Sequence, residues 1–256
     1  MTTTRQNGSL YTQIQKNIAT IEFGHPASNS FPSELLTRLT NELNTIAKNN
    51  TVAIVILKSE GEKAFCAGAS FSELIAIDNL EAGKQFFAGF ANVINAMRTC
   101  GKIIIGRVQG KTVGGGVGLA AACDYVFATE NAAIKLSELT IGIGPFVIAP
   151  AVKRKIGVAA LAELTLDASS WQNAYWAKEK GLYAKVFDNL KELDDEVSLF
   201  AEKLATYNAE ALAEMKKVLW LGTENWNALL AERAAISGEL VLSEFTKNAL
   251  SKFAKK

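Results

Sequence analysis

Residues 52–57 form an uninterrupted run of apolar, mostly β-branched side chains, which is the composition of a strand buried on both faces. Strands of this kind occur in parallel sheets, where helices cover both faces and connect successive strands. A helix is expected directly before this run. Behind Pro32, apolar side chains recur at helical spacing, namely at Leu35, Leu36, Leu39, Leu43 and Ile46. This stretch therefore favours an α/β fold.

The alternation of strand, small-residue loop and helix recurs further along the chain. The expected elements are a β-hairpin or two edge strands at 11–23, a loop at 66–70, a helix around 87–97, a strand at 102–108, glycines at 114–116, a helix at 117–122 and a strand at 124–128. Repeated units of this type predict the α/β class for the first part of the chain.

After Gly157 the pattern becomes almost wholly helical. Helices are expected at 159–166, 171–180, 190–207, 209–221 and from 225 to the end. We therefore predict two parts, a core of residues 1–190 and a helical C-terminal region of residues 191–256, although no Pro/Gly linker separates them.

Composition excludes several classes of function. Lys and Arg total 27 against 26 Asp and Glu, so the chain has no overall field that would attract nucleic acid or an anionic membrane. Three scattered cysteines lack the spacing of a zinc site or a disulfide framework. Residues 1–9 are polar and do not read as a secretory signal, and no apolar run is long enough to span a membrane. We expect a soluble protein of the cytoplasm with no bound metal.

Two turns of small residues, 66–70 and 114–116, each lie between an expected strand and an expected helix. Backbone N–H groups in such turns can bind anions, and one N–H from each could form an oxyanion hole. Tight packing of helix on strand explains an isolated glycine run equally well, so spacing alone does not decide. A dinucleotide or phosphate loop is disfavoured, because residues 114–118 do not fit G-x-G-x-x-G and no Gly-Lys-Ser/Thr follows them.

Four segments in register resemble successive signatures of the crotonase family, the enoyl-CoA hydratases and isomerases. They are AFCAGASF at 64–71, VQG at 108–110 with GGGVGL at 114–119, ACD at 122–124, and SELTIG at 137–142. A fifth segment, WAKEKGLYAKV at 176–186, is similar to a later part of that family. The resemblance runs in order from about residue 10 to residue 190, and more loosely to the C-terminus.

The resemblance implies a spiral core of ββα turns, a helical C-terminal region that assembles trimers or dimers of trimers, and an acyl-CoA substrate with no separate cofactor. It also implies that the N–H groups of Ala69 and Gly115 hold the thioester oxygen. The residues expected to line the substrate and coenzyme path are Asn29, Ala67, Gly68, Ser70, Gly114, Gly116 and Gly118.

Hydratases of this family typically pair two glutamates, at the positions that match Gly118 and Glu138. Here the first is glycine, which removes a carboxylate that would activate water. Glu138 is flanked by Leu136, Leu139 and Ile141, and an apolar wall would raise its pKa toward neutrality, as a proton shuttle requires. We therefore predict Glu138 as the general acid and base.

The sequence is compatible with three hypotheses about function: an enoyl-CoA hydratase/isomerase, an enzyme that only isomerises the double bond, and an acyl-CoA-binding protein with impaired catalysis. A Ser–His hydrolase is disfavoured, because His25 is the only histidine and precedes Pro26 in an apparent turn. Five aromatic side chains are candidates either for the wall of an acyl pocket or for the core, namely Phe71, Phe87, Phe90, Phe146 and Trp171.

Overall fold

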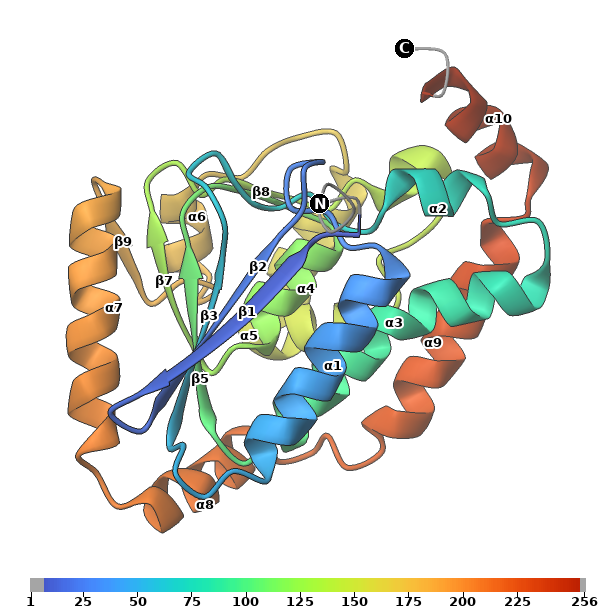
Figure 1. Ribbon diagram of the computed structural model, residues 1–256. Coiled ribbons are helices and arrows are strands. Elements are labelled where there is room, and N and C mark those ends of the chain that lie inside the picture. The colour runs from blue at the N-terminus through green and yellow to red at the C-terminus, as the bar shows by residue number, and fades with distance from the viewer. Residues whose placement is uncertain (1–6, 254–256) are drawn as a thin grey trace, which may run out of the picture.

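The computed structural model describes residues 7–253, which form two sheets and the helices around them (Figure 1). Within these residues the main sheet has six strands in the order β1-β2-β3-β5-β7-β9 and a second sheet has three in the order β4-β6-β8. The main strands are β1 (Ser9–Gln15), β2 (Ile18–Gly24), β3 (Ile54–Ser59), β5 (Ile103–Val108), β7 (Tyr125–Thr129) and β9 (Lys185–Phe187). The short strands are β4 (Ala64–Cys66), β6 (Lys111–Val113) and β8 (Ile134–Lys135). The α/β class is confirmed.

The main sheet is parallel except for its first pair. β1 and β2 form an antiparallel hairpin whose two-residue turn, Lys16 and Asn17, has φ values of 50° and 63°. Positive φ at both turn positions matches the twist of the flanking strands. β2, β3, β5, β7 and β9 then run parallel to one another. The predicted hairpin and the buried central strands are therefore confirmed.

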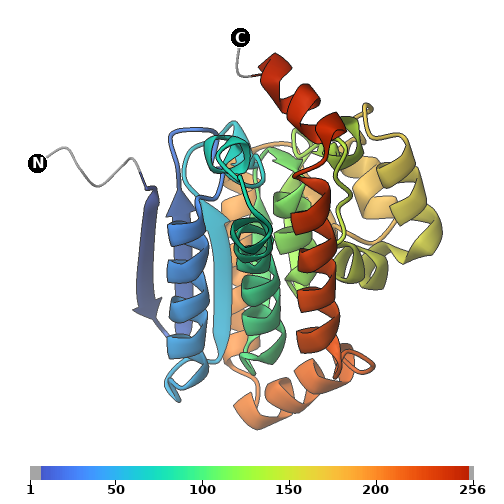
Figure 2. The same cartoon turned by 90° about the vertical axis from the view of Figure 1, so that its right-hand side faces the viewer.

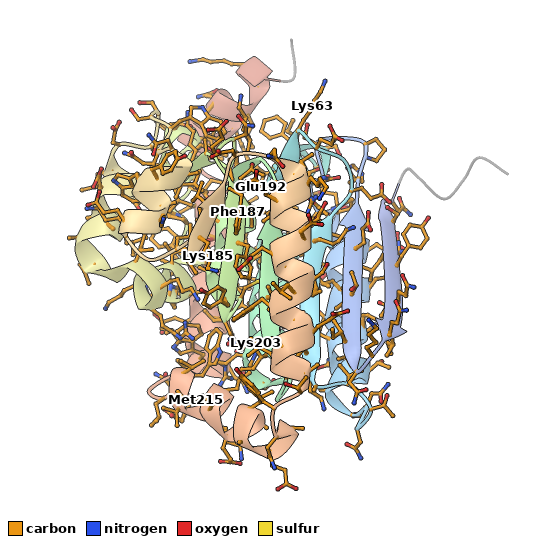
Figure 3. The ribbon with its side chains drawn as sticks, turned by 90° about the vertical axis from the view of Figure 1, so that its left-hand side faces the viewer. Lys63, Lys185, Phe187, Glu192, Lys203 and Met215 are labelled. Carbon is orange, nitrogen blue, oxygen red and sulfur yellow. The ribbon has the colours of Figure 1, made fainter. Side chains whose placement is uncertain are left out.

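Helices cover both faces of the main sheet. The helices of the described residues are α1 (Ser33–Ala47), α2 (Phe71–Ile75), α3 (Leu80–Thr99), α4 (Gly115–Ala122), the 3-10 turn η1 (Glu138–Ile141), α5 (Ala149–Leu166), α6 (Ala174–Glu179), α7 (Leu190–Ala205), α8 (Ala209–Leu219), α9 (Trp226–Leu240) and α10 (Glu244–Phe253). Figure 2 shows α1, α3 and α9 upright in a row on one face. Figure 3 shows α7 lying along the strands on the other face of the sheet.

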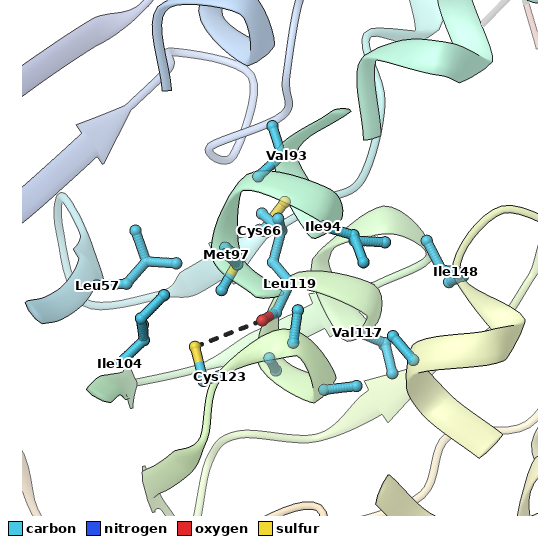
Figure 4. Packing of buried hydrophobic residues seen from close by; sticks show 14 of the residues in the cluster. Leu57, Cys66, Val93, Ile94, Met97, Ile104, Val117, Leu119, Cys123 and Ile148 are labelled. Atoms are coloured by element: carbon cyan, nitrogen blue, oxygen red, sulfur yellow. Dashed lines mark hydrogen bonds between the residues drawn. The ribbon is translucent and has the colours of Figure 1, made fainter. Parts of the chain in front are cut away.

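The two faces carry separate hydrophobic cores. The larger core joins the sheet to α1, α3 and α4, and Figure 4 shows its centre, where Leu57 and Ile104 of the strands meet Met97 and Leu119 of the helices. The smaller core lies under α7, where Ile105 and Phe127 contact Leu193 and Val197. Strands buried on both faces explain the continuous apolar runs in the sequence.

Several predicted helices have different bounds in the structure. The helix expected at 171–180 is α6, Ala174–Glu179, because Gln172 pairs with Ile134 through hydrogen bonds of 2.8 and 3.0 Å. Asn173 then caps α6 by accepting the Trp176 N–H at 2.8 Å. The helix expected from 225 onward is interrupted after Leu240, and α10 begins at Glu244.

The helices that follow residue 190 pack directly on the core. α9 lies along α3 so closely that a Cβ atom at Gly83 would be 2.8 Å from the backbone oxygen of Gly238. The division of the chain at residue 190 and the trimer-forming role of its second part stay predictions. Residues 1–6 and 254–256, at the ends of the two predicted parts, lie outside the described residues. No helix in the described part of the chain is long and apolar enough to cross a membrane.

Candidate active site

The first small-residue loop follows β4 and includes residues 66–70. Gly68 has a φ of 92°, which a residue with a side chain rarely adopts. Its carbonyl accepts the Phe31 N–H at 2.8 Å, and the Phe31 carbonyl accepts the Ser70 N–H at 2.8 Å. In a parallel bridge of this kind the N–H of the middle residue, Ala69, points away from the partner segment. Within residues 7–253, no hydrogen bond uses the Ala69 N–H.

The second loop connects β6 to α4. Gly114 has a φ of 53° and precedes the first helical residue, Gly115. The Val117 and Gly118 N–H groups both donate to the Gly114 carbonyl, at 2.9 and 3.3 Å. The Gly115 N–H has no acceptor among the described residues. A free N–H at a helix N-terminus carries partial positive charge and favours an anion.

The two loops are in direct contact. β4 and β6 are parallel neighbours, so the loops that follow them leave the second sheet at the same edge. A Cβ atom at Gly68 would lie 3.2 Å from the Val113 oxygen and 3.6 Å from the Gly115 nitrogen. A Cβ atom at Gly116 would lie 2.7 Å from the Cys66 oxygen. Close packing therefore explains some of these glycines, and it also brings the two unpaired N–H groups into one region.

Glu138 stands beside the second loop, at the first position of η1. A Cβ atom at Gly114 would lie 2.8 Å from Glu138 Oε1, so glycine leaves the space for this carboxyl. Glu138 Oε2 is buried and has no hydrogen-bond partner within residues 7–253. Burial raises the pKa of Glu138 to about 7, and the hydrogen bond from its own backbone N–H opposes this shift. Glu138 is therefore poised to give and accept a proton near neutral pH.

Both loops and Glu138 face one cavity of about 360 Å³. Apart from the loops and η1, its wall is mainly apolar. The side chains that form this wall include Phe71, Leu74, Phe86, Phe87, Phe90, Ile143, Phe146 and Ile148. An apolar chamber with a few polar groups at one end is typical of a site for a small organic ligand. Four of the five aromatic candidates line it, whereas Trp171 lies beneath the Lys111 and Lys135 ammonium groups.

The predicted site residues divide into two groups. Those that line the cavity are Ala67, Gly68, Ala69, Gly114, Gly115 and Glu138. Ser70 instead caps α2 by accepting the Glu73 N–H, and Gly116 packs on Cys66. The Asn29 side chain is buried below the first loop, where its Nδ2 donates to the carbonyls of Glu60 and Ala64 at 2.8 and 2.9 Å.

Gly118 packs against an aliphatic side chain. A Cβ atom at this position would lie 2.6 Å from the Cβ atom of Ile148, which directly precedes α5. Ile148 belongs to the same buried cluster as Val117 and Ile94 (Figure 4). The space that a glutamate at position 118 would need is therefore filled by hydrocarbon.

The structure supports neither a cysteine nucleophile at Cys66 nor a metal site within residues 7–253. Burial raises the pKa of the Cys66 thiol to about 12, so it stays protonated and unreactive at neutral pH. Among residues 7–253, no group of three His, Cys, Asp or Glu side chains is placed to hold a metal ion.

Several residues of the cavity wall carry no signal in the sequence, and Ile148 and Ser237 are two of them. Ile148 and Ser237 both line the cavity, yet Ser237 comes from α9, far along the chain. Their positions are set by how α5 and α9 pack, and no local pattern marks either residue.

This fold and cavity define an α/β protein with two N–H-bearing loops and one carboxyl around an apolar chamber. The sequence profile of the enoyl-CoA hydratase/isomerase family matches residues 13–254. The chain therefore belongs to the enoyl-CoA hydratase/isomerase, or crotonase, family, as its motifs predicted.

Relatives within the family differ in activity. The chain is 28% identical to a short-chain-enoyl-CoA hydratase of Clostridium acetobutylicum, over 93% of this chain and 92% of that protein. It is 29% identical to a peroxisomal Δ(3,5)-Δ(2,4)-dienoyl-CoA isomerase of Arabidopsis thaliana, over 69% of this chain and 67% of that one. The crystal structure of an enoyl-CoA hydratase from Bacillus halodurans shares the fold, with a TM-score of 0.88 at 21% identity over 95% of this chain and 99% of the other.

Proposed function

We propose that the protein acts on acyl-CoA thioesters by moving a proton on the acyl chain near the thioester carbonyl. One observation carries this proposal: two unpaired backbone N–H groups and one unpaired carboxyl oxygen belong to residues that line the same cavity. The names of the hydratase and isomerase relatives support an unsaturated acyl-CoA as the substrate.

In this proposal the thioester oxygen accepts hydrogen bonds from the Ala69 and Gly115 N–H groups. Loss of a proton from the α-carbon leaves an enolate whose negative charge is concentrated on that oxygen. Two amides in a rigid frame stabilise this charge without needing a cation, and the N-terminus of α4 adds partial positive charge. The close contact of the two loops at Gly68 and Gly115 supports this arrangement.

Glu138 is the proposed general base and acid. Its carboxylate removes a proton from the α-carbon, and the C–H electron pair passes into the conjugated system and onto the thioester oxygen. The same carboxyl then returns the proton to the γ-carbon, so that the double bond has moved and no atom is gained or lost. A carboxyl with a pKa of about 7 suits both steps.

The packing at Gly118 favours isomerisation over hydration. Addition of water requires a group that orients and deprotonates the water, and general base catalysis of this kind contributes about 10²- to 10⁴-fold. Ile148 fills the space beside Gly118 with hydrocarbon, which offers water no hydrogen bond. A single carboxyl is sufficient for transfer of a proton between two carbons. We therefore propose double-bond isomerisation as the main reaction.

The test follows both reactions separately in the purified protein. β,γ-Unsaturated acyl-CoAs report migration of the double bond, and α,β-unsaturated acyl-CoAs report addition of water. We expect migration to be the faster reaction, and we expect Glu138→Gln to lower kcat at least about 10²-fold while acyl-CoA still binds.

Two other outcomes would redirect the proposal. Fast hydration would make the protein a hydratase that orients water without a carboxylate at position 118. Tight binding of acyl-CoA without turnover of any substrate would favour a binding protein. If Glu138→Gln left turnover unchanged, the role proposed for Glu138 would be wrong.

Three further expectations rest on the resemblance alone. The coenzyme is proposed to pass the first loop at Ala67, and the folded unit is proposed to be a homotrimer or a dimer of trimers in the cytoplasm. The Asn29 side chain contributes to this path indirectly, since its hydrogen bonds fix the segments on which the first loop rests.

A further inference from the structure

The hydroxyl of Ser237, in the cavity wall, has no hydrogen-bond partner among the described residues. Ser237 is 1% exposed, lines the cavity, and its Oγ makes no hydrogen bond with any of residues 7–253. A serine inside a helix often donates to the carbonyl four residues earlier. Ser198 on α7 does so, with its Oγ 2.8 Å from the Asp194 oxygen. The Ser237 hydroxyl is therefore left available to the cavity.

Ser237 and the second loop lie at opposite ends of a stripe of α3 residues that runs from Gly83 to Phe90. A Cβ atom at Gly115 would overlap the Phe90 ring, so Phe90 marks the loop end of the stripe. Gly83 contacts Gly238, the neighbour of Ser237, and marks the other end. Phe90 and Gly83 are about two helical turns apart, on the order of 10 Å. An acyl chain that leaves the loops along α3 therefore reaches Ser237 with its distal part.

The other polar side chains in the cavity wall come from residues 135–140, around η1. Thr140 Oγ1 already donates to the Ser137 carbonyl, and Lys135 Nζ donates to the Ser169 carbonyl. Around Ser237 the packing is hydrocarbon, with Phe86, Ile143 and Val241 in the nearby cluster. A buried hydroxyl without a partner costs free energy, and a ligand that supplies the partner recovers it.

We propose that Ser237 recognises an uncharged oxygen function, a hydroxyl or carbonyl, on the part of the acyl chain remote from the thioester. This inference rests on the proposed function, because it assumes that the acyl chain occupies the cavity. A distal carboxylate is outside the preferred class, since the apolar side chains of the nearby cluster would solvate its charge poorly. Ser237 is thus a specificity-determining residue of the acyl pocket.

The experiment compares pairs of unsaturated acyl-CoAs that share a chain length and differ only in a terminal hydroxyl. We expect the wild-type protein to prefer the hydroxylated member about tenfold in kcat/KM, the effect of one uncharged hydrogen bond. Ser237→Ala should abolish this preference, so that the two members of each pair have similar kcat/KM values. Ser198→Ala, on the far face of the sheet, is the matched control and should keep the wild-type preference.

A second arm measures binding of the corresponding saturated acyl-CoAs by calorimetry, with the same variants. The preference should appear there too, whether or not the protein turns over any substrate. Equal preference in wild type and Ser237→Ala overturns the role of Ser237 alone. Failure of every acyl-CoA to bind overturns both this inference and the proposed function.

Discussion

At the scale of single residues, Glu138 gains its chemistry from what surrounds it. Its Oε2 atom is buried without a partner, and no cation is paired with the carboxylate among the described residues. Desolvation therefore raises its pKa to about 7. The carboxyl is half protonated at neutral pH, which matches a group that must both accept and return a proton.

The first prediction concerns the pH dependence of activity. The carboxylate is the form that removes the proton, so kcat/KM should rise about tenfold per pH unit below about 7 and level off above it. Any residual activity of Glu138→Gln should lack this transition. A midpoint near the ordinary glutamate value of 4.5 would show that burial does not perturb this group.

The same shift affects stability with a defined sign. Because the folded state holds the proton of Glu138 more tightly than the unfolded state, the free energy of unfolding should fall as pH rises from about 4.5 to about 7. Glu138→Gln removes this contribution. Urea unfolding of both proteins across this range should therefore show Glu138→Gln gaining stability relative to wild type as pH rises.

Residue roles differ in how far they follow from sequence. Glu138 and the N–H positions at Ala69 and Gly115 are predicted from motifs, and all three line the cavity. Ile148 and Ser237 leave no local signal in the sequence. Ile148 reaches Gly118 because of how α5 packs, and Ser237 reaches the cavity because of how α9 packs on α3.

At the scale of elements, one buried carboxylate joins strands and helices from distant parts of the chain. Asp124, directly before β7, accepts hydrogen bonds from the Ile104 N–H at 2.7 Å, the Lys216 ammonium at 2.8 Å and the Trp220 indole at 2.7 Å. The Asp124 and Lys216 side chains are both 2% exposed. Asp124 thus links α8 and the segment after it to the start of β5 and β7 in the main sheet.

Two neighbouring lysines of α8 allow a matched test of this link. Lys216→Met removes the buried ammonium that hydrogen-bonds to the Asp124 carboxylate and should cost about 3–5 kcal/mol of unfolding free energy. Lys217 forms an exposed pair with Glu214, and Lys217→Met should cost at most about 1 kcal/mol. Chemical denaturation of the two variants measures both values. Equal losses would mean that the buried pair does not hold α8 in place.

Elements with a strong apolar pattern are predicted well. β3 and α1 follow from a continuous apolar run and from helical spacing. By contrast, β4, β6, β8 and β9 have only two or three residues each, too few for any period to appear. These short strands exist because neighbouring segments pair with them, as β4 does with β6. The position of the candidate site therefore depends on a second sheet that the sequence does not reveal.

At the scale of the whole molecule, the cavity is assembled from separate parts of the chain. The loops come from the second sheet, Glu138 from η1, and the far wall from α3 and α9. Figure 2 shows α9 beside α3, although more than a hundred residues separate them. One C-terminal helix, α9, thus contributes Ser237 to the cavity wall, a role that periodicity and composition could not indicate.

The proposed function requires that the Ala69 and Gly115 N–H groups meet at one thioester oxygen beside Glu138. A crystal structure of the Glu138→Gln protein with an unsaturated acyl-CoA tests it most directly. We predict the thioester oxygen at about 2.7–3.1 Å from both backbone nitrogens, with the α-carbon next to the residue 138 side chain. A thioester bound outside this cavity, or an oxygen that contacts neither nitrogen, would show that the Ala69 and Gly115 N–H groups do not have the proposed role.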